Sequence, residues 1–352
     1  MTNNKLPRYQ RFVEMTKSKR LPVIAGDLAH DGKHLGYAVS ADAFLVPPHT
    51  IFAEIGTVLQ TTSWTRWLDR IIGTEFDDLS FLDYEYGWYA NALIRSGHFS
   101  TGIDPFRIRK WANFEQEFVD AESRFSACAT LHDALLGALL GNSADRSQIQ
   151  QAADFVLLAE PKLEMLDRKA TLSIVADNFG REFLDDLILA IRFHQETGQK
   201  IEVHVKKLPI FVSDTTINDC DRLLQYTLKN ETKLSEAINS LHNNKKLLFK
   251  CDEFWSSPLG FSEIPHEIFQ ASTGTIIIKG DLNYRRAIDD VVVAADTPFA
   301  DLPSLPRRPL LSLRSVKSYC LAGVGSHQVD PWEFPMDGSI FLAQEVPAAG
   351  GH

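Results

Sequence analysis

The chain has 352 residues, of which 44% are hydrophobic, and its formal net charge at pH 7 is −10. This length suggests one large domain or two, and the hydrophobic content is enough for a sizeable core. The negative charge argues against a general nucleic-acid binder, whose affinity comes from a basic surface.

Helical periodicity dominates residues 1 to about 165. The spacing of apolar residues predicts helices over 81–94, 106–125 and 131–140. Strand-like runs are scarce in this part of the chain. We therefore predict an all-helical N-terminal subdomain over residues 1–165.

From residue 166 to residue 352, short apolar runs alternate with amphipathic segments. Strands are expected at 171–176, 201–206, 246–250, 274–279, 310–316 and 339–345. Helices are expected at 181–195, 216–228, 231–241 and 283–290. This alternation is typical of an α/β fold with a mainly parallel sheet that helices cover on both faces.

One predicted strand ends in an unusual polar segment. The apolar run from Thr275 to Ile278 is followed directly by Lys279-Gly280-Asp281-Leu282-Asn283-Tyr284-Arg285-Arg286. Such a segment offers oxygen ligands and cations at one point. Because ligands of open α/β sheets bind just outside the carboxyl ends of the strands, we predict a binding site here.

Three other predicted strands end in a similar way. Asp177 and Asn178 follow the strand at 171–176, Asp214 comes soon after the strand at 201–206, and Arg314 and Lys317 lie at the end of the strand at 310–316. The carboxylate and amide oxygens suit Mg²⁺ or Mn²⁺. Lysine and arginine side chains suit a phosphate group.

Each of these residues also has an ordinary structural interpretation. Asp177-Asn178 and Asp214 could be N-caps of the helices that follow them, and taken alone this is the better interpretation. The segment from Gly280 to Asn283 could be a plain strand-to-helix turn. Lys279 could be a strand-edge residue whose charge reaches solvent.

Taken together, the segments resemble a known family, the metal-dependent damage-control phosphatases, in the branch once called acidic-residue methyltransferases. The family has a Val-Asp-Asn-Ala-Gly-Phe-Glu-type segment, a Val-Lys-x-x-Pro-x-Phe-Val-Ser-Asp segment, a Lys-Gly-Asp-Leu-Asn-Tyr-Arg segment and a late Arg-Thr-x-Lys motif. They match residues 176–182, 205–214, 279–285 and 314–317 here, with Ser315 in place of Thr. Three independent caps would not need to follow one family's order and spacing.

The N-terminal half matches the family more loosely. Residues 85–89 resemble a Glu-Cys-Tyr-Met-Tyr-Arg segment, with Ala90 in place of the final Arg. Residues 104–106 match an Asp-Pro-Phe motif, and Asn142 and Asp145 match a Gly-Asn-x-x-Asp motif.

The resemblance implies roles for individual residues. Asp177, Asn178 and Asp214 would bind a divalent metal ion, which could be Mn²⁺, Mg²⁺, Co²⁺ or Ni²⁺. The implied substrate contacts are Asp281, Leu282, Asn283, Tyr284, Arg285 and Lys317. We add Lys279, Arg314 and Glu85 as candidate substrate contacts, and we expect Asp177, Asp214 and Lys317 to be catalytic.

The implied activity is metal-dependent hydrolysis of small phosphate monoesters, notably sugar phosphates, in a metabolite-repair role. In the mechanism that we favour, Lys317 and Arg285 hold phosphate oxygens, while Asp281 and Asn283 face sugar hydroxyls or a water. The expected partner is a small phosphorylated metabolite, not a nucleic acid or a membrane.

Two alternatives stay open. The family was also reported to methylate glutamates with S-adenosylmethionine, but such enzymes usually need a glycine-rich loop, and only Gly180 lies near Asp177. The chain could also be a biosynthetic enzyme or a non-catalytic sensor that has changed chemistry on the same scaffold. Ala90 and Ser315 are the departures that keep this second alternative open.

Three features of the sequence bear on the cellular compartment. The four cysteines show no Cys-x-x-Cys spacing, so we expect reduced thiols rather than a zinc site or a redox pair. The first residues lack an apolar signal region, and no stretch approaches the ~20 apolar residues of a membrane span. A cytoplasmic protein is the expectation by default.

Overall fold

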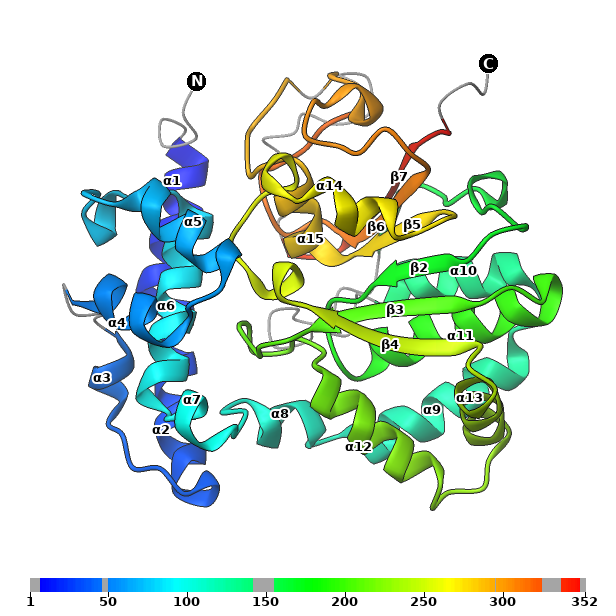
Figure 1. The fold of residues 1–352 in the computed structure, drawn as a ribbon, viewed down its shortest axis with the longest axis horizontal. Helices are drawn as coiled ribbons and strands as arrows, with labels where there is room; N and C mark the ends of the chain where they lie inside the picture. The colour runs from blue at the N-terminus through cyan, green and yellow to red at the C-terminus, as the bar shows by residue number, and fades with distance from the viewer. Residues whose placement is uncertain (1–6, 46–49, 142–154, 295, 325–336, 349–352) are drawn as a thin grey trace. The chain divides into compact units, whose positions relative to one another are not determined.

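A computed structural model describes residues 7–45, 50–141, 155–294, 296–324 and 337–348. The chain forms two compact units, and Figure 1 traces the path through both. Unit 1 contains residues 1–112, 208–212 and 256–259. Unit 2 contains residues 113–207, 213–255 and 260–352.

Unit 1 is helical. Its α-helices are α1 (Pro7–Met15), α2 (Leu21–Leu35), α3 (Ala41–Leu45), α4 (Ile51–Val58), α5 (Thr62–Ile71), α6 (Phe81–Arg95), α7 (His98–Thr101) and α8 (Arg107–Trp111). Helix α6 begins at the Ser80 N-cap, whose hydroxyl accepts a hydrogen bond from the Asp83 main-chain N–H. Its aromatic side chains, including Tyr86, Trp88 and Tyr89, are buried. The helix predicted at 81–94 is therefore confirmed.

Unit 2 is built on a seven-stranded sheet with the order β1-β7-β6-β5-β2-β3-β4. The strands are β1 (Val156–Ala159), β2 (Leu172–Val175), β3 (Ile201–Lys206), β4 (Leu247–Asp252), β5 (Ile276–Lys279), β6 (Leu310–Ser315) and β7 (Ile340–Val346). Strands β4, β3, β2, β5 and β6 run parallel to one another. Strand β7 is antiparallel to β6, and β1 is parallel to β7. The expectation of a mainly parallel sheet is confirmed, although β1 was not expected.

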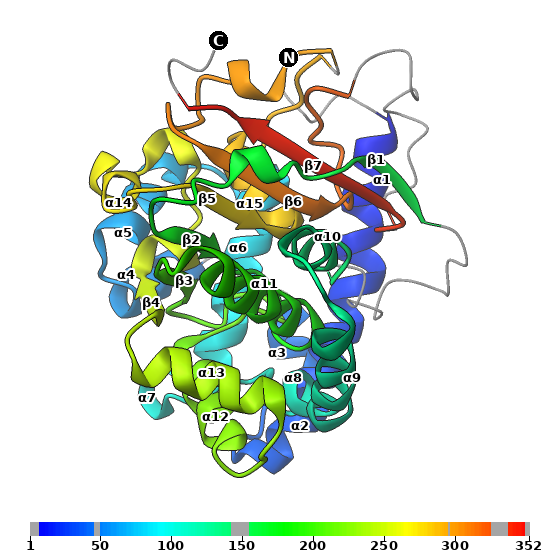
Figure 2. The same ribbon diagram turned by 90° about the vertical axis from the view of Figure 1, so that its right-hand side faces the viewer.

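Helices cover the sheet of unit 2 on both faces, as expected. They are α9 (Phe114–Ala127), α10 (Leu131–Gly141), α11 (Arg181–Thr197), α12 (Ile217–Thr227), α13 (Lys233–Asn243), α14 (His266–Gln270) and α15 (Gly280–Ala287). Helix α11 packs against α9, α10 and α13, whereas α15 packs against β5 and β6. Right-handed crossovers place α11 and α15 on opposite faces, and Figure 2 shows α10 and α11 in front of the sheet with α15 behind it.

Two expectations about the helices need correction. A single helix was expected over 106–125, but Asn113 has non-helical dihedral angles of −116° and 11° and separates α8 from α9. Helices α9 and α10 were expected to belong to the N-terminal subdomain, yet they pack with α11. The two units accordingly divide near residue 112, not near residue 165.

The strand order reverses direction between β2 and β5. From β2 the chain continues across the sheet to β3 and β4, whereas β5 and β6 lie on the other side of β2. The carboxyl ends of β2 and β5 therefore form a topological switch point, where open α/β sheets bind their ligands.

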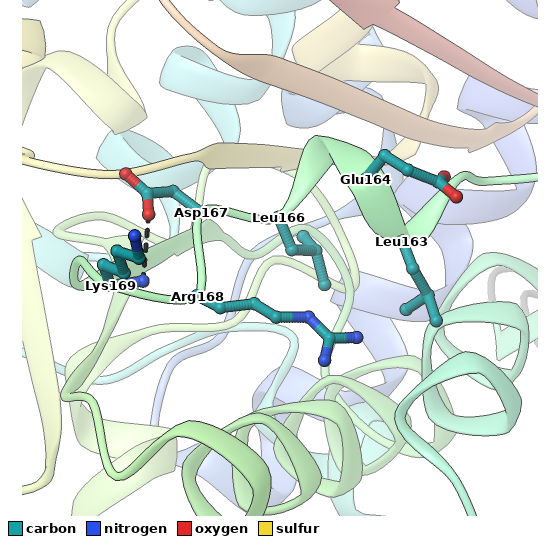
Figure 3. A pocket seen from close by; sticks show the side chains of 6 residues that line it. All are labelled: Leu163, Glu164, Leu166, Asp167, Arg168 and Lys169. Atoms are coloured by element: carbon teal, nitrogen blue, oxygen red, sulfur yellow. Dashed lines mark hydrogen bonds between the residues drawn. The ribbon is translucent and has the colours of Figure 1, made fainter.

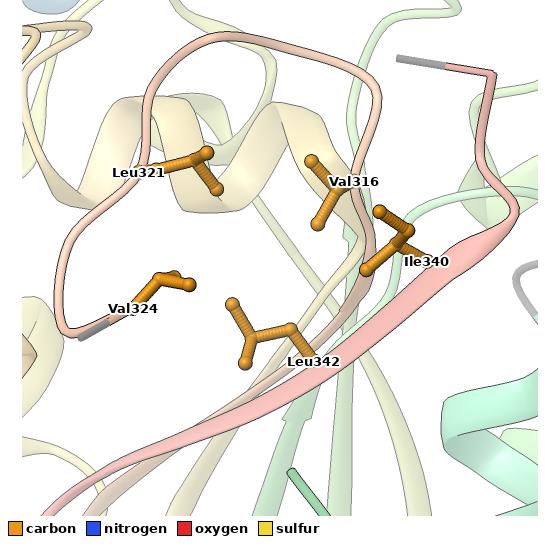
Figure 4. Packing of buried hydrophobic residues seen from close by; sticks show 5 residues of the cluster. All are labelled: Val316, Leu321, Val324, Ile340 and Leu342. Carbon is orange, nitrogen blue, oxygen red and sulfur yellow. The ribbon is translucent and has the colours of Figure 1, made fainter. Parts of the chain in front are cut away.

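The segment after β6 is anchored by a small hydrophobic cluster. Val316, Leu321 and Val324 from this segment pack on Ile340 and Leu342 of β7 (Figure 4). This packing fixes the main chain on both sides of Lys317.

Among the described residues, no helix is long and apolar enough to cross a membrane.

Candidate functional site

Asp177 and Gly280 meet at the switch point. Asp177 follows the end of β2 and is 6% exposed, while Gly280 is the first residue of α15 and has a φ of 80°. A Cβ atom at Gly280 would lie 1.8 Å from Oδ2 of Asp177. Glycine is therefore required at position 280 for two reasons. It adopts the left-handed backbone conformation without strain, and it lets the Asp177 carboxylate approach closely.

Main-chain hydrogen bonds hold the Asp214 segment beside the ends of β2 and β3. Thr215 N–H donates to the carbonyl of Asp177, and Lys206 N–H donates to the carbonyl of Thr215, both at 2.8 Å. Asn178 and Asp214 also form an isolated antiparallel bridge. The structure thus brings Asp177, Asn178 and Asp214 together, although Asp214 is far from the other two in sequence.

The interpretation of these residues as helix caps is wrong. The N-cap of α11 is Gly180, which makes no side-chain capping bond. The N-cap of α12 is Thr216, which forms a capping box with Asp219. The polar side chains of Asp177, Asn178 and Asp214 are therefore not explained by helix capping.

The carboxamide of Asn178 is oriented from two sides. Its Nδ2 donates to Oε2 of Glu182 at 2.8 Å, and its Oδ1 accepts from the Ser213 hydroxyl at 2.5 Å. Glu182 is a buried residue in the first turn of α11. Sequence reasoning placed Glu182 in a family segment but gave it no role. Its spacing of four residues from Asn178, across the start of a helix, was the available signal.

Several charges act on one another in this cluster. Burial raises the pKa of Asp177 well above its usual range, and the nearby carboxylates of Glu182 and Asp214 raise it further, while Lys206 and Lys317 lower it. Burial lowers the pKa of Lys206, against the opposite influence of Asp214 and Asp177. Lys206 was not selected from the sequence, although it is a strand-end cation like Lys317.

Asp281 connects the start of α15 to the end of β6. Its Oδ1 accepts hydrogen bonds from the Arg314 guanidinium at 2.9 Å and from the Lys317 main-chain N–H at 3.2 Å. Arg314 is fully buried, with its guanidinium 3.4 Å from the centre of the Tyr284 ring. The Tyr284 hydroxyl in turn accepts from Ala322 N–H at 3.1 Å, and burial raises its pKa to about 12. Arg314 and Tyr284 thus support the main chain that carries Asp281 and Lys317.

Two predicted substrate contacts are held in internal ion pairs. Lys279 is 0% exposed, and its ammonium lies 2.8 Å from Oδ1 of Asp186, towards α11. Arg285 lies in the last turn of α15, where its guanidinium pairs with both carboxylate oxygens of Asp290, at 2.7 and 3.2 Å. A surface position for Lys279 is therefore excluded. The helix was expected at 283–290, whereas α15 spans Gly280–Ala287, so Arg285 lies near its end rather than near its start.

The remaining residues that the sequence analysis selected lie apart from these ion pairs or outside the described residues. Leu282 is half-buried on α15. Glu85 belongs to α6 of unit 1, where it is buried and its carboxylate lies 3.7 Å from the Arg20 guanidinium. Asn142 and Asp145 lie outside the described residues.

The expected metal ligands form a suitable set of donors. Asp177 and Asp214 are both buried, and the charge of Asp214 raises the pKa of Asp177. A divalent cation would relieve the repulsion between two such carboxylates, and Asn178 adds an amide oxygen. Over the described part of the chain, no cluster of three His, Cys, Asp or Glu side chains suited to a metal is found. The expected ligand set contains only two side chains of these types, Asp177 and Asp214, together with the amide of Asn178. The absence of a cluster of three therefore does not contradict it.

A surface hollow of about 580 Å³ lies elsewhere on unit 2 (Figure 3). It is lined by Leu163, Glu164, Leu166, Asp167, Arg168 and Lys169. These residues precede the start of β2, and the main chain of Asp167 is hydrogen-bonded to Thr275, which precedes β5. The hollow therefore lies at the amino-terminal edge of the sheet, opposite the candidate site.

Comparison with known proteins identifies the family of the chain. The family described as the damage-control phosphatase ARMT1-like domain matches residues 50–330. The chain belongs to this family. The resemblance found in the sequence is therefore confirmed over most of the chain.

Relatives within the family are distant. Damage-control phosphatase ARMT1 of Rattus norvegicus is 28% identical over 189 residues, which are 50% of this chain and 43% of the rat protein. The Bos taurus protein of the same name is 30% identical over 165 residues, covering 44% of this chain and 37% of its own length. The chain thus matches less than half the length of these relatives.

A DUF89 family protein from Pyrococcus horikoshii superimposes with a TM-score of 0.44 at 14% identity, over 79% of this chain and 92% of that one.

Proposed function

We propose that the chain is a metal-dependent phosphatase that hydrolyses small phosphate monoesters, with sugar phosphates as the preferred class, in a metabolite-repair role. The observation that carries this proposal is the pair of buried carboxylates, Asp177 and Asp214, at the switch point, where Lys206 and Lys317 lower the pKa of Asp177. Membership of the damage-control phosphatase family supports the same reaction.

Asp177, Asn178 and Asp214 would hold the divalent ion, which could be Mn²⁺, Mg²⁺, Co²⁺ or Ni²⁺. When bound, such an ion neutralises charge on the phosphate oxygens. Glu182 and Ser213 contribute indirectly, because they orient the Asn178 carboxamide. Fixed orientation of a ligand by its neighbours is a general requirement of metal sites.

Lys317 is the cation proposed to contact the phosphate. Its side chain is half-buried, and it acts electrostatically on Asp177. A fixed ammonium in a partly dry site donates strong, charge-assisted hydrogen bonds to phosphate oxygens. Asp281 positions this residue through the Lys317 main-chain N–H. Lys279, Arg285, Arg314 and Tyr284 then act from inside the protein, as supports of the strand and helix ends.

The test is a panel of phosphate monoesters assayed for phosphate release with each of the four metals. We expect release from at least one sugar phosphate, and we expect it to stop after exhaustive chelation and to return when metal is added back. Release that survives chelation would contradict the metal requirement. Calorimetric binding of S-adenosylmethionine without any phosphate release would favour the methyltransferase alternative instead.

A further inference from the structure

Asn283 was expected to face the substrate, but its side chain is committed to the protein. It is 0% exposed. Its Nδ2 donates to the carbonyl of Lys279 at 2.8 Å and to the carbonyl of Ala176 at 3.3 Å. Its Oδ1 accepts from the ammonium of Lys206 at 3.2 Å. Because a carboxamide has only two donor hydrogens, both are used by main-chain carbonyls.

These partners belong to three different strand ends. Ala176 directly follows β2, Lys206 is the last residue of β3, and Lys279 is the last residue of β5. Ala176 is also the residue immediately before Asp177. A single carboxamide therefore connects the three strand ends around the two expected metal-binding carboxylates.

We propose that Asn283 and Lys206 form a clamp that positions Asp177 and Asp214, and that Asn283 is a positioning residue rather than a substrate contact. Lys206 has two links to the same region. Its ammonium holds Asn283, while its main-chain N–H donates to Thr215, the neighbour of Asp214. Loss of either side chain would loosen the same strand ends. The inference about the metal rests on the proposed function, but the inference about the strand ends does not.

The first test measures amide hydrogen exchange in the presence of chelator, so that neither metal nor activity is involved. The reporter amides are those of Ala176, Lys206 and Thr215, which bridge the ends of β2 and β3. Asn283→Leu and Lys206→Met should each speed exchange at these amides by roughly tenfold, because each variant removes buried hydrogen bonds. The amides of Leu172 and Ile201, at the opposite ends of the same strands, should be unchanged.

Lys250→Met is the matched control, because Lys250 lies on the neighbouring strand β4 and its ion pair with Glu202 is partly exposed. Lys206→Arg should restore much of the protection, since it keeps a donor for the Asn283 Oδ1. Should Asn283→Leu fail to fold, Lys206→Met still decides, because it keeps both main-chain bonds of Asn283. Parent-like exchange at the three reporters in both variants would overturn the proposal.

The second test separates positioning from substrate contact. If the clamp positions the metal ligands, Asn283→Leu should weaken Mn²⁺ binding in calorimetry by roughly 10–100-fold. At saturating Mn²⁺ it should lower kcat with little change in KM. A raised KM with unchanged Mn²⁺ affinity would instead make Asn283 a substrate contact. If the parent protein binds no Mn²⁺, the proposed function fails, while the exchange experiment still tests the clamp.

Discussion

At the scale of single residues, Lys317 is held in place by its neighbours. Val316 lies in the cluster with β7, and the Lys317 main-chain N–H is bonded to Asp281. Lys317→Ala therefore removes one preorganised charge and leaves its surroundings intact, so we expect turnover to fall on the order of 10²–10³-fold. Lys317→Arg should rescue only in part, because a planar guanidinium does not reproduce a compact ammonium. Lys169→Ala, at the other edge of the sheet, is the control; parent-like turnover of Lys317→Ala would contradict the role.

Asp177 and Asp214 are the residues on which metal binding should depend most. Asp177→Ala or Asp214→Ala deletes one of two anionic ligands, so we expect Mn²⁺ binding and phosphate release to be lost. Calorimetry with Mn²⁺ and the phosphate assay measure the two effects separately. Asp167→Ala, which changes a carboxylate at the amino-terminal edge, should retain both. Normal Mn²⁺ affinity in both site variants would remove these residues from the ligand set.

The sequence predicted which residues would lie together at the candidate site better than it predicted their contacts. Asp177, Asn178 and Asp214 were selected because they follow apolar runs and match a family's order; the structure brings them together, and their role as metal ligands stays a prediction. The internal pairing of Lys279 with Asp186 could not be foreseen, because a strand pattern does not say which face its last residue points to. Lys206 was overlooked because its ammonium acts through Asn283, which is distant in sequence. Glu182 was overlooked although its spacing from Asn178 was a local signal.

At the scale of elements, the turn from β5 into α15 places two constraints on the residue at position 280. Gly280→Ala would combine a left-handed backbone with a Cβ placed against the Asp177 carboxylate. We expect a loss of roughly 2–4 kcal/mol in the free energy of unfolding from the strain and the overpacking together. Denaturant titration of the variant measures this loss.

Gly198 at the end of α11 provides the matched comparison. Its φ is 71°, and a Cβ atom there would meet nothing within 4 Å. Gly198→Ala should therefore cost only about 1 kcal/mol, the backbone strain alone. Equal losses in the two variants would show that the close approach to Asp177 adds nothing.

Most elements of unit 2 were predicted because their apolar patterns are long and regular. The strands at 201–206 and 310–316 correspond closely to β3 and β6. Strand β1 was missed because it is partly exposed, whereas β2 and β5, which also have four residues, are buried throughout. The antiparallel direction of β7 has no local signal either, since strand direction depends on the path of the connecting chain.

At the scale of the whole molecule, the pH dependence of stability should include a contribution from His204. Burial on β3 lowers the pKa of His204 to about 4, while Glu202 and Asp252 oppose this effect and Lys250 adds to it. The unfolded chain takes up this proton near its ordinary pKa of about 6.5. The contribution of His204 to stability should therefore fall as the pH drops from about 6.5 towards 4, by on the order of 3 kcal/mol.

Unfolding by denaturant at a series of pH values tests this prediction. His204→Gln should flatten the dependence between pH 4 and about 6.5, because it removes the group that takes up the proton. The exposed His34 on α2 offers the control variant, His34→Gln, which should keep the parent slope. An unchanged slope in His204→Gln would assign the acid sensitivity to other groups.

The placement of β2 next to β5 has a consequence for how the protein folds. Their paired residues, such as Ser173 and Ile276, lie roughly a hundred residues apart, with β3, β4 and their helices between them in the chain. Contacts of such long range close slowly, because chain entropy is lost before any pairing is gained. Local pairs such as β3 with β4 can form before this contact does. The candidate site would then be incomplete in partly folded chains. Fragments that end before β5 keep Asp177 and Asp214 but lack Asn283 and Lys317, so they should bind metal more weakly and have no activity.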